Sequence, residues 1–297
     1  PSGLVRSFDI WKLSVPIRLK SVYGGFMKTS GQFLSPIRQT EMYPVETADR
    51  PVVGYAKDYP AGLMADAHSH PRAQLIYAVS GVMHVETQTA GYIIPPSTAL
   101  LMPADTEHAI YMDGPVAMRA LFLKRTAANG ICDDCKVISV TPLLRELILA
   151  ACCEPLDWDI NGRGRHVTSL ALGEIERSSV LPMDLPLPTD SRLRRVIDAL
   201  RAKPHNTNSL EDWASIANAS ERTLARLFRK ETGLSFRQWR QQARLTAAMC
   251  ALSVGENPTK AAAIAGFDSQ SAFGAAFRKF FGITPGQVRA SATSPLQ

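Results

Sequence analysis

Short apolar segments follow one another from Pro51 to about Arg125. Examples are "VVGYAKDYP", "AQLIYAVSGVMHVET" and "TALLMPA", in which apolar and polar positions alternate. A period of two places every second side chain on the same face of a strand. Gly, Pro and Asp separate the segments at the spacing of about 8 to 12 residues that is typical of all-β folds. The pattern predicts a β-sandwich or a small barrel over residues 51–125.

The periodicity becomes helical within residues 137–180, in "TPLLRELILAACCE" and "RHVTSLALGEIERSS". Thr141 and Pro142 suit the N-cap and the first helical position. The apolar stripe of the first helix is too large for a helix exposed to water, so it must pack on the barrel of its own chain or on a second copy of the chain. Its members are Leu143, Leu144, Leu147, Ile148 and Ala151.

Two further segments complete the organisation of the chain. Pro182, Pro186 and Pro188 lie close together and predict an extended linker. Residues 191–297 are helical in pattern and form a separate domain. Residues 1–50 lack sustained periodicity and are interpreted as a leader or arm. The expected fold class is therefore α+β, with a β-barrel or jelly-roll domain followed by helices and an all-α domain.

The segment "SLEDWASIANASERTLARLFRKETG" predicts two short helices joined by a sharp turn. Leu210, Trp213, Ile216 and Ala217 mark the inner face of the first helix, and Ser220 can cap the second. The inner face of the second helix contains Leu224, Leu227 and Phe228. Its outward basic residues are Arg222, Arg226, Arg229 and Lys230. This is the outline of a helix-turn-helix, whose second helix enters the major groove of DNA.

A similar arrangement recurs in "NPTKAAAIAGFDSQSAFGAAFRKFFGITPGQVR", where Ser269 can cap the second helix. Its inner face contains Phe273, Phe277 and Phe280, and its outward polar residues are Gln270, Ser271, Arg278 and Lys279. A long helix in between can hold the two units rigidly. One copy would be compatible with an ordinary helical bundle with basic faces, whereas two copies favour DNA binding.

Charge supports this interpretation, because the chain has a net charge of +6 and its excess of basic over acidic residues lies in the C-terminal part. From Thr189 onward there are 16 Lys and Arg against 8 Asp and Glu. Such an asymmetry indicates a polyanionic partner. Five cysteines are an odd number and argue against a secreted disulfide framework. The absence of an apolar stretch of membrane length predicts a cytoplasmic protein with no membrane partner.

Two histidines stand one residue apart in "GLMADAHSHPRAQL", at His68 and His70. Residues two apart on a strand point to the same face, so both imidazoles can reach one ion. Gln74 follows four residues after His70, and His108 follows Pro103 in "PADTEH". Cys132 and Cys135 form a Cys-x-x-Cys pair that could bind zinc or act as a redox switch. Zinc would need a matching second pair, however, and the adjacent Cys152 and Cys153 are poor chelators, so a site is not expected and the role of the cysteines stays open.

The residues from "ASERTLARLFRKETGLSF" onward, with Arg244 and "AGFDSQSAFGAAFRKFFGITPGQVR", resemble the DNA-binding domain of the AraC family of transcriptional regulators. The resemblance implies that residues 191–297 bind double-stranded promoter DNA through two helix-turn-helix units. Implied base readers are Arg222, Ala225 and Arg226, then Gln270, Ser271 and Ala275. The wider implied DNA-contact set adds Ser220, Thr223, Arg229, Lys230, Ser269, Arg278 and Lys279. We expect the first unit to provide most of the direct specificity. A homodimer formed through the helices at 137–180 is also implied, and RNA polymerase is a candidate partner.

The histidine spacing resembles the two motifs of the cupin barrel, a fold that encloses metals or small molecules. The resemblance implies metal ligands at His68, His70, Gln74 and His108, with Gln74 in place of the usual carboxylate. Three imidazoles and an amide oxygen can hold a divalent transition metal such as Zn, Ni, Fe or Mn. The alternatives are that the histidines line a small-molecule pocket or are hydrogen-bonded core residues.

Together these features predict a transcription factor, not an enzyme, controlled by a small-molecule or metal effector bound in a cupin-like sensor domain. The alternative from another class is a metal-dependent cupin enzyme fused to a DNA-binding domain, which the missing carboxylate disfavours. A purely architectural DNA binder would be indifferent to any small molecule.

Overall fold

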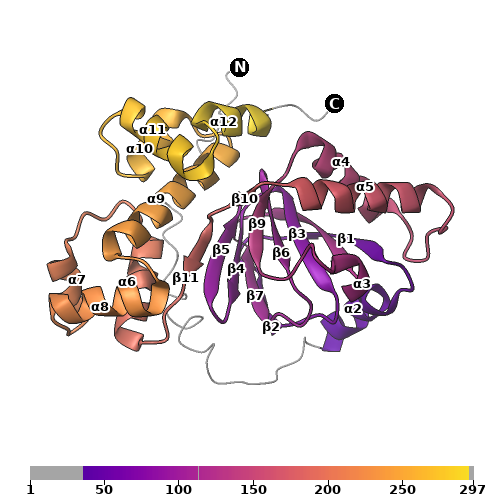
Figure 1. Cartoon of the computed structure of the whole chain (residues 1–297), viewed down its shortest axis with the longest axis horizontal. Helices are drawn as coiled ribbons and strands as arrows, with labels where there is room; N and C mark the ends of the chain where they lie inside the picture. Colours follow the sequence, from indigo (N-terminus) through magenta and orange to yellow (C-terminus); the bar gives the residue numbers. More distant parts are fainter. Residues whose placement is uncertain (1–35, 113, 294–297) are drawn as a thin grey trace, which may run out of the picture.

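The computed structural model describes residues 36–112 and 114–293. Figure 1 shows two layers of β-strands, with helices α4 and α5 along one side and a helical domain, α6 to α12, on the other. All strand pairs are antiparallel and form one six-stranded and one five-stranded sheet. In spatial order the six-stranded sheet contains β1 (Val52–Tyr59), β8 (Val116–Leu123), β3 (Ala73–Ser80), β6 (Thr98–Met102), β9 (Lys136–Ser139) and β10 (Val180–Leu181). The five-stranded sheet contains β11 (Asp184–Pro186), β5 (Ala90–Ile94), β4 (Met83–Thr87), β7 (His108–Met112) and β2 (Met64–His68).

Strand β3 is buried on both of its faces. Ile76 and Ala78 belong to the cluster between the two sheets, whereas Leu75 and Tyr77 belong to the cluster under the helices. Because both faces avoid water, the strand is nearly continuously apolar. Gln74 lies on the same side of β3 as Ile76, so this polar side chain enters the space between the sheets.

The helices that follow the barrel are α3 (Arg125–Ala128), α4 (Pro142–Cys153) and α5 (Arg163–Arg177). The Thr141 side chain caps α4 as predicted, since it accepts a hydrogen bond from the Leu144 amide. Leu144, Leu147 and Ile148 are buried against the outer face of the six-stranded sheet of the same chain. Most of the predicted apolar stripe is therefore covered within one chain, and only Leu143 is exposed.

The sheets continue beyond residue 125, the sequence-based boundary of the sensor domain. Strand β9 lies inside the segment that was expected to be helical and pairs with β6. The predicted linker is extended, but β10 and β11 lie in it as paired edge strands, on β9 and β5 respectively. Pro186 is at the end of the edge strand β11, where a residue without an N–H group is tolerated.

The leader predicted over residues 1–50 contains a helix, α2 (Pro36–Thr47); residues 1–35 lie outside the described part. Met42 and Val45 of α2 are buried against Val53, Ala120 and Phe122 of the six-stranded sheet. Among the residues of α2 whose burial is described, two apolar side chains anchor the helix, a signal too sparse for hydrophobic periodicity to reveal.

The C-terminal domain is all-α, as predicted. Its helices are α6 (Ser191–Ala202), α7 (Leu210–Ile216), α8 (Glu221–Thr232), α9 (Phe236–Ser253), α10 (Pro258–Ile264), α11 (Gln270–Phe281) and α12 (Pro285–Thr293). Trp213, Leu224 and Phe228 form the core of the first unit together with the apolar face of α6. Ile216 differs from its predicted inward position and is 48% exposed.

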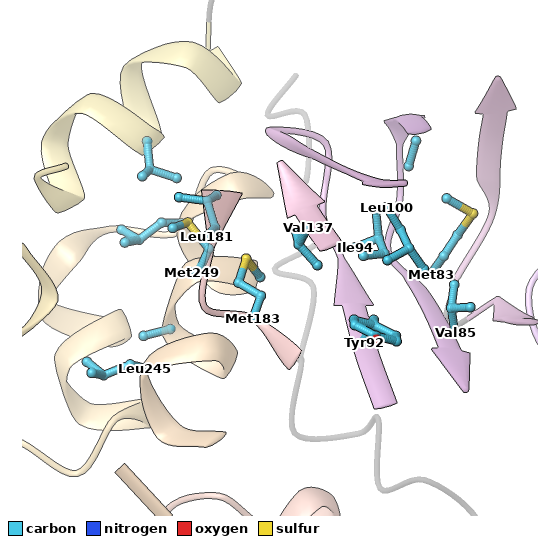
Figure 2. Close-up of a cluster of buried hydrophobic side chains, with 14 of the residues drawn as sticks. Met83, Val85, Tyr92, Ile94, Leu100, Val137, Leu181, Met183, Leu245 and Met249 are labelled. Atoms are coloured by element: carbon cyan, nitrogen blue, oxygen red, sulfur yellow. The ribbon is translucent and has the colours of Figure 1, made fainter. Parts of the chain in front are cut away.

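The barrel and the helical domain share an apolar core. Figure 2 shows Leu181 and Met183 between the strands that carry Val137 and Tyr92 and the helix that carries Leu245 and Met249. The helical domain is therefore packed on the barrel and is not separated from it by a free linker. Within the described ranges, no helix combines the length and apolar character needed to span a membrane.

Candidate functional site

Three histidines meet at one end of the space between the sheets. His68 is the last residue of β2 and pairs in register with His108, the first residue of β7. His70 follows β2 by two residues, and its carbonyl accepts a 2.7 Å hydrogen bond from the Asp105 amide. All three rings are buried, and one nitrogen from each ring lies within 4.8 Å of the others. Strand pairing thus brings together the two histidine positions that are distant in sequence.

Hydrogen bonds set the orientation of each imidazole. Nδ1 of His68 lies 2.6 Å from the Asp66 carbonyl oxygen, and Nδ1 of His108 lies 2.9 Å from that of Thr106. A carbonyl only accepts, so in both rings Nδ1 carries the hydrogen and Nε2 keeps the lone pair. Nδ1 of His70 lies 2.7 Å from Oε1 of Glu46, which fixes the same tautomer when this carboxylate is ionised. All three rings can present Nε2 to a common ligand.

Two buried polar atoms have no hydrogen-bond partner among the residues that the structure describes at this site, Nε2 of His108 and Oε1 of Gln74. Gln74 comes from the opposite sheet, so the predicted donor set is drawn from both layers. A buried acceptor without a partner costs about 1–3 kcal/mol. Three imidazole nitrogens and an amide oxygen suit a divalent transition metal, and such an ion would satisfy both atoms.

Burial keeps His70 and His108 neutral near pH 7. Desolvation lowers the pKa of His70 to about 4. Desolvation, with a smaller contribution from the neighbouring His68, lowers the pKa of His108 to about 3. Neutral imidazole is the form that binds metals, so no proton has to leave either ring near pH 7.

A cavity of about 30 Å³ adjoins the cluster. Its polar lining residues are His68, His70, Gln74 and Glu41, and the others are apolar or aromatic, including Tyr55, Met118 and Phe122. Water requires a cavity of roughly 10–15 Å³, whereas drug-sized ligands occupy about 300–1,000 Å³. In this conformation the space suits an ion with one or two small ligands.

Glu46 and Arg72 are site residues that the motifs did not reveal. Arg72 is buried and donates 3.0 Å hydrogen bonds to the carbonyls of Glu46 and Arg50, and another to that of Ala48. It thereby fixes the end of α2 and the backbone of Glu46, whose carboxylate orients His70. Burial raises the pKa of Glu46, although His68 and Arg72 oppose this effect. Nothing in the local sequence links positions 46 and 70.

The acidic residues that the sequence placed near the histidines have other roles. Glu107 is partly exposed to solvent and accepts a 2.8 Å hydrogen bond from Gln88. Glu86 faces the helical domain. Asp66 contributes its backbone carbonyl to His68. The carboxylate in hydrogen-bond contact with the cluster is that of Glu46.

The cysteines are free thiols in the described residues. Burial raises the pKa of Cys132 to about 12 and that of Cys152 to about 11. Burial also raises the pKa of Cys135. The thiol form dominates at neutral pH, and thiols are poor metal ligands and nucleophiles.

The second helix of each helix-turn-helix unit presents the predicted polar residues outward. Ser220 caps α8 by accepting a hydrogen bond from the Thr223 amide, and Ser269 caps α11 in the same way through Ala272. Apolar residues hold both helices from the inner side. The exposed residues of the predicted DNA-contact set are Ser220, Arg222, Arg226, Arg229, Lys230, Ser269, Gln270, Ser271, Arg278 and Lys279. Thr223 is half-buried, and its hydroxyl lies 2.8 Å from that of Ser220.

Arg244 in α9 connects the two units. Its Nε and Nη2 donate 2.8 Å hydrogen bonds to the carbonyls of Pro204 and Asn206, which precede α7. Its guanidinium also lies against Gly266, in the turn before α11, where a Cβ would be 3.0 Å from Nη1. The long helix therefore holds both units through packing and through this side chain.

Known proteins match both parts of the chain. Residues 213–291 match a family described as a helix-turn-helix domain, and residues 51–161 match the AraC-like ligand binding domain. The chain is 32% identical over 232 residues to the HTH-type transcriptional regulator NimR of Escherichia coli K12, covering 78% of this chain and 85% of NimR. It is 31% identical over 138 residues to the arabinose operon regulatory protein of the same organism, covering 43% and 47% of the two chains.

Among solved structures, ToxT from Vibrio cholerae aligns with 82% of this chain and 100% of its own, at 11% identity and a TM-score of 0.36. The sequence relatives named above are transcriptional regulators and not enzymes, in agreement with the prediction for this chain. The extent of the match to NimR and the two matched domains lead to one conclusion. The chain belongs to the AraC family of HTH-type transcriptional regulators, with a DNA-binding domain and a ligand-binding domain.

Proposed function

We propose that this regulator senses a divalent transition metal, bound by His68, His70, His108 and Gln74 in a cupin-type barrel. The observation that carries the proposal is the pair of buried atoms at the site, Nε2 of His108 and Oε1 of Gln74, that lack hydrogen-bond partners among the described residues. Both atoms are good metal donors, and the neutral rings need not lose a proton to bind.

The chemistry of the donor set defines the effector further. All four donors are neutral, so a bound ion keeps its full positive charge and attracts a small anionic ligand. The carboxylate of Glu46 is hydrogen-bonded to His70 and belongs to the outer layer of the site, where such groups orient a ligand and strengthen its basicity. The effector is accordingly a metal ion, or a small anion held through that ion.

The regulator is further proposed to act as a homodimer on promoter DNA, where RNA polymerase is the candidate partner. Leu143 on α4 and Leu170 on α5 are 54% and 57% exposed and support the outer faces of these helices as the contact surface. Size-exclusion chromatography with light scattering tests this part. Two chains per particle are expected, and a monomer at all concentrations would contradict it.

Elemental analysis of the purified protein tests the metal site directly. We expect about one transition-metal ion per chain in the unaltered protein and none in His68→Ala. His84→Ala is a matched control, because His84 lies on β4 outside the cluster. No metal in the unaltered protein after incubation with Zn, Ni, Fe or Mn would exclude the proposed effector and leave an organic ligand.

The DNA response requires a separate measurement. Duplexes selected from random sequence by the full chain serve as probes, and fluorescence anisotropy measures affinity with and without the metal. Allosteric effectors change affinity by factors of about 5–150, so a change in this range is expected in the unaltered protein and not in His68→Ala. Equal affinities with and without the metal would mean that the ion is structural.

A further inference from the structure

A partly buried cluster of charges joins the barrel to the DNA-binding domain. Glu86 on β4 accepts hydrogen bonds from two arginines of α6, Arg194 at Oε1 and Arg201 at Oε2, the latter at 3.3 Å. Asp198 completes the cluster, 3.1 Å from Nε of Arg194. Two cations and two anions balance, which is the condition under which charges tolerate burial. We call these four residues the Glu86 cluster.

The sheet is shaped to receive this contact. Gly91 on β5 is paired with Glu86 across the two strands. A Cβ at Gly91 would lie 3.0 Å from Nη2 of Arg201, so the absence of a side chain lets the guanidinium lie on the strand. Burial raises the pKa of Asp198, which reflects how far this cluster is withdrawn from water.

Helix α6 is part of the first helix-turn-helix unit. Leu193, Val196 and Leu200 pack with Trp213 and Phe228 in one core. Arg194 and Arg201 therefore belong to a helix that is packed into the unit, and a displacement of this helix would displace the whole unit. The second unit meets the barrel elsewhere, where the hydroxyls of Ser97 and Ser253 lie 2.8 Å apart at the end of α9.

The Glu86 cluster and the histidine cluster share one pair of strands. In the β4–β7 ladder Thr87 is opposite His108, and Glu86 is opposite Ala109. Successive residues of a strand point to opposite faces. His108 therefore points between the sheets while Glu86, one ladder position away, points outward to α6. A shift of β7 at His108 moves the strand that carries Glu86.

We propose that Glu86 is the positioning residue of the sensor domain, which holds the DNA-binding domain in one orientation and passes the state of the histidine site to it. The second half of this statement rests on the proposed function; the first half does not. Arg222, Arg226 and Gln270 are exposed in this arrangement. The contact therefore fixes the direction in which the DNA-binding residues face and does not cover them.

The test uses the full chain with Glu86→Gln, which keeps the shape of the side chain and removes its charge. Hydrogen–deuterium exchange of α6 is measured on metal-free protein, so this arm is independent of any effector. Removing one partner of a buried ion pair is costly, and we expect exchange in α6 to become about tenfold faster or more. Glu107, a partly exposed carboxylate beside β7 hydrogen-bonded to Gln88, provides the matched control Glu107→Gln, which should leave α6 unchanged.

Arg201→Gln approaches the same contact from the other side. If the two groups act through one contact, the double variant exchanges no faster than the faster single variant. Independent, multiplicative effects in the double variant, or unchanged exchange in Glu86→Gln, would refute the positioning role. Circular dichroism identifies a variant that fails to fold, and in that case Glu86→Asp, which keeps the charge but shortens the reach, should give a smaller acceleration in a folded protein.

The second arm measures DNA affinity of Glu86→Gln with and without Zn²⁺ by anisotropy, together with the zinc content. We expect unchanged zinc content and loss of the metal-dependent change in affinity. A metal response equal to that of the unaltered protein would contradict the coupling. If the unaltered protein bound neither Zn²⁺ nor Ni, Fe or Mn, the proposed function would be contradicted instead, while the exchange arm would still decide the positioning role.

Discussion

Two substitutions at Gln74 should change stability and metal affinity in opposite directions. Gln74 is 4% exposed, and its Oε1 lacks a hydrogen-bond partner among the described residues. Gln74→Met has a similar shape and removes this oxygen, so metal-free protein should gain about 1–3 kcal/mol of stability. Gln74→Glu instead buries a carboxylate, whose desolvation should cost metal-free protein several kcal/mol.

The expected metal affinities reverse this order. Gln74→Met loses a donor atom, and we expect metal affinity to fall about tenfold or more. In Gln74→Glu the carboxylate attracts the ion by about 4 kcal/mol per unit charge at 4 Å and an effective dielectric constant of about 20. For a divalent ion this attraction is twice as large. A proton that competes for the buried carboxylate reduces the gain in metal affinity. A net gain of about 3 kcal/mol, or about 100-fold tighter binding, is expected.

Thermal unfolding and a competition titration with a chromophoric chelator measure the two quantities. For chains of this size 1 kcal/mol corresponds to about 2–4 °C, so the metal-free Tm values of the two variants should lie well apart. His84→Ala again serves as the control. Its metal affinity should equal that of the unaltered protein. If both Gln74 variants bound metal like the unaltered protein, Gln74 would not face the ion, and the proposed donor set would be wrong.

Four other outcomes follow from the structure. Arg226→Ala should weaken binding to a selected duplex by about 1–3 kcal/mol and relax the preference at one base pair, measured by gel shift against substituted duplexes. Arg278→Ala should weaken all duplexes alike and lower the salt slope of log K by about 1; a loss confined to one sequence would contradict its phosphate role. Leu147→Ala should lower the free energy of unfolding in urea by about 2–5 kcal/mol, because Leu147 is buried against the barrel of its own chain. A change in oligomeric state alone would contradict this expectation. Because burial lowers the pKa of His70 to about 4, its neutral form contributes stability above pH 6.5 that is lost as pH falls toward 4, by about 3 kcal/mol. His108, whose pKa burial also lowers, adds to the same slope, so His70→Asn should remove the contribution of His70 in metal-free protein and leave that of His108; an unchanged slope would contradict the assignment.

The helix-turn-helix units were accessible from sequence because their signals are local. Ser220 and Ser269 each directly precede the helix that they cap, and the apolar faces repeat within one helix. The spacing of His68, His70 and Gln74 was similarly informative, because a strand and the turn after it fix their relative positions. His108 was found through a second short motif. Each of these signals lies within a few residues of the group it identifies.

Contacts between distant segments could not be predicted in the same way. Glu46 reaches His70 only because α2 packs on the sheet through two apolar residues, and Pro44 inside that helix obscures its pattern. Glu86 meets Arg194 across 108 positions. The stripe around Leu147 indicated that a partner surface exists, but an apolar stripe does not specify whether that surface belongs to the same chain.

The energetics of the histidine site suit a sensor. Without an ion, Nε2 of His108 and Oε1 of Gln74 each lack a partner among the described residues, at a cost of about 1–3 kcal/mol per atom. An ion bound as proposed would remove that cost and place positive charge beside β7, which pairs with β4. Allosteric coupling requires about 1–3 kcal/mol of difference between states. Glu86 lies on β4, the neighbour of β7, and its carboxylate is in contact with the DNA-binding domain.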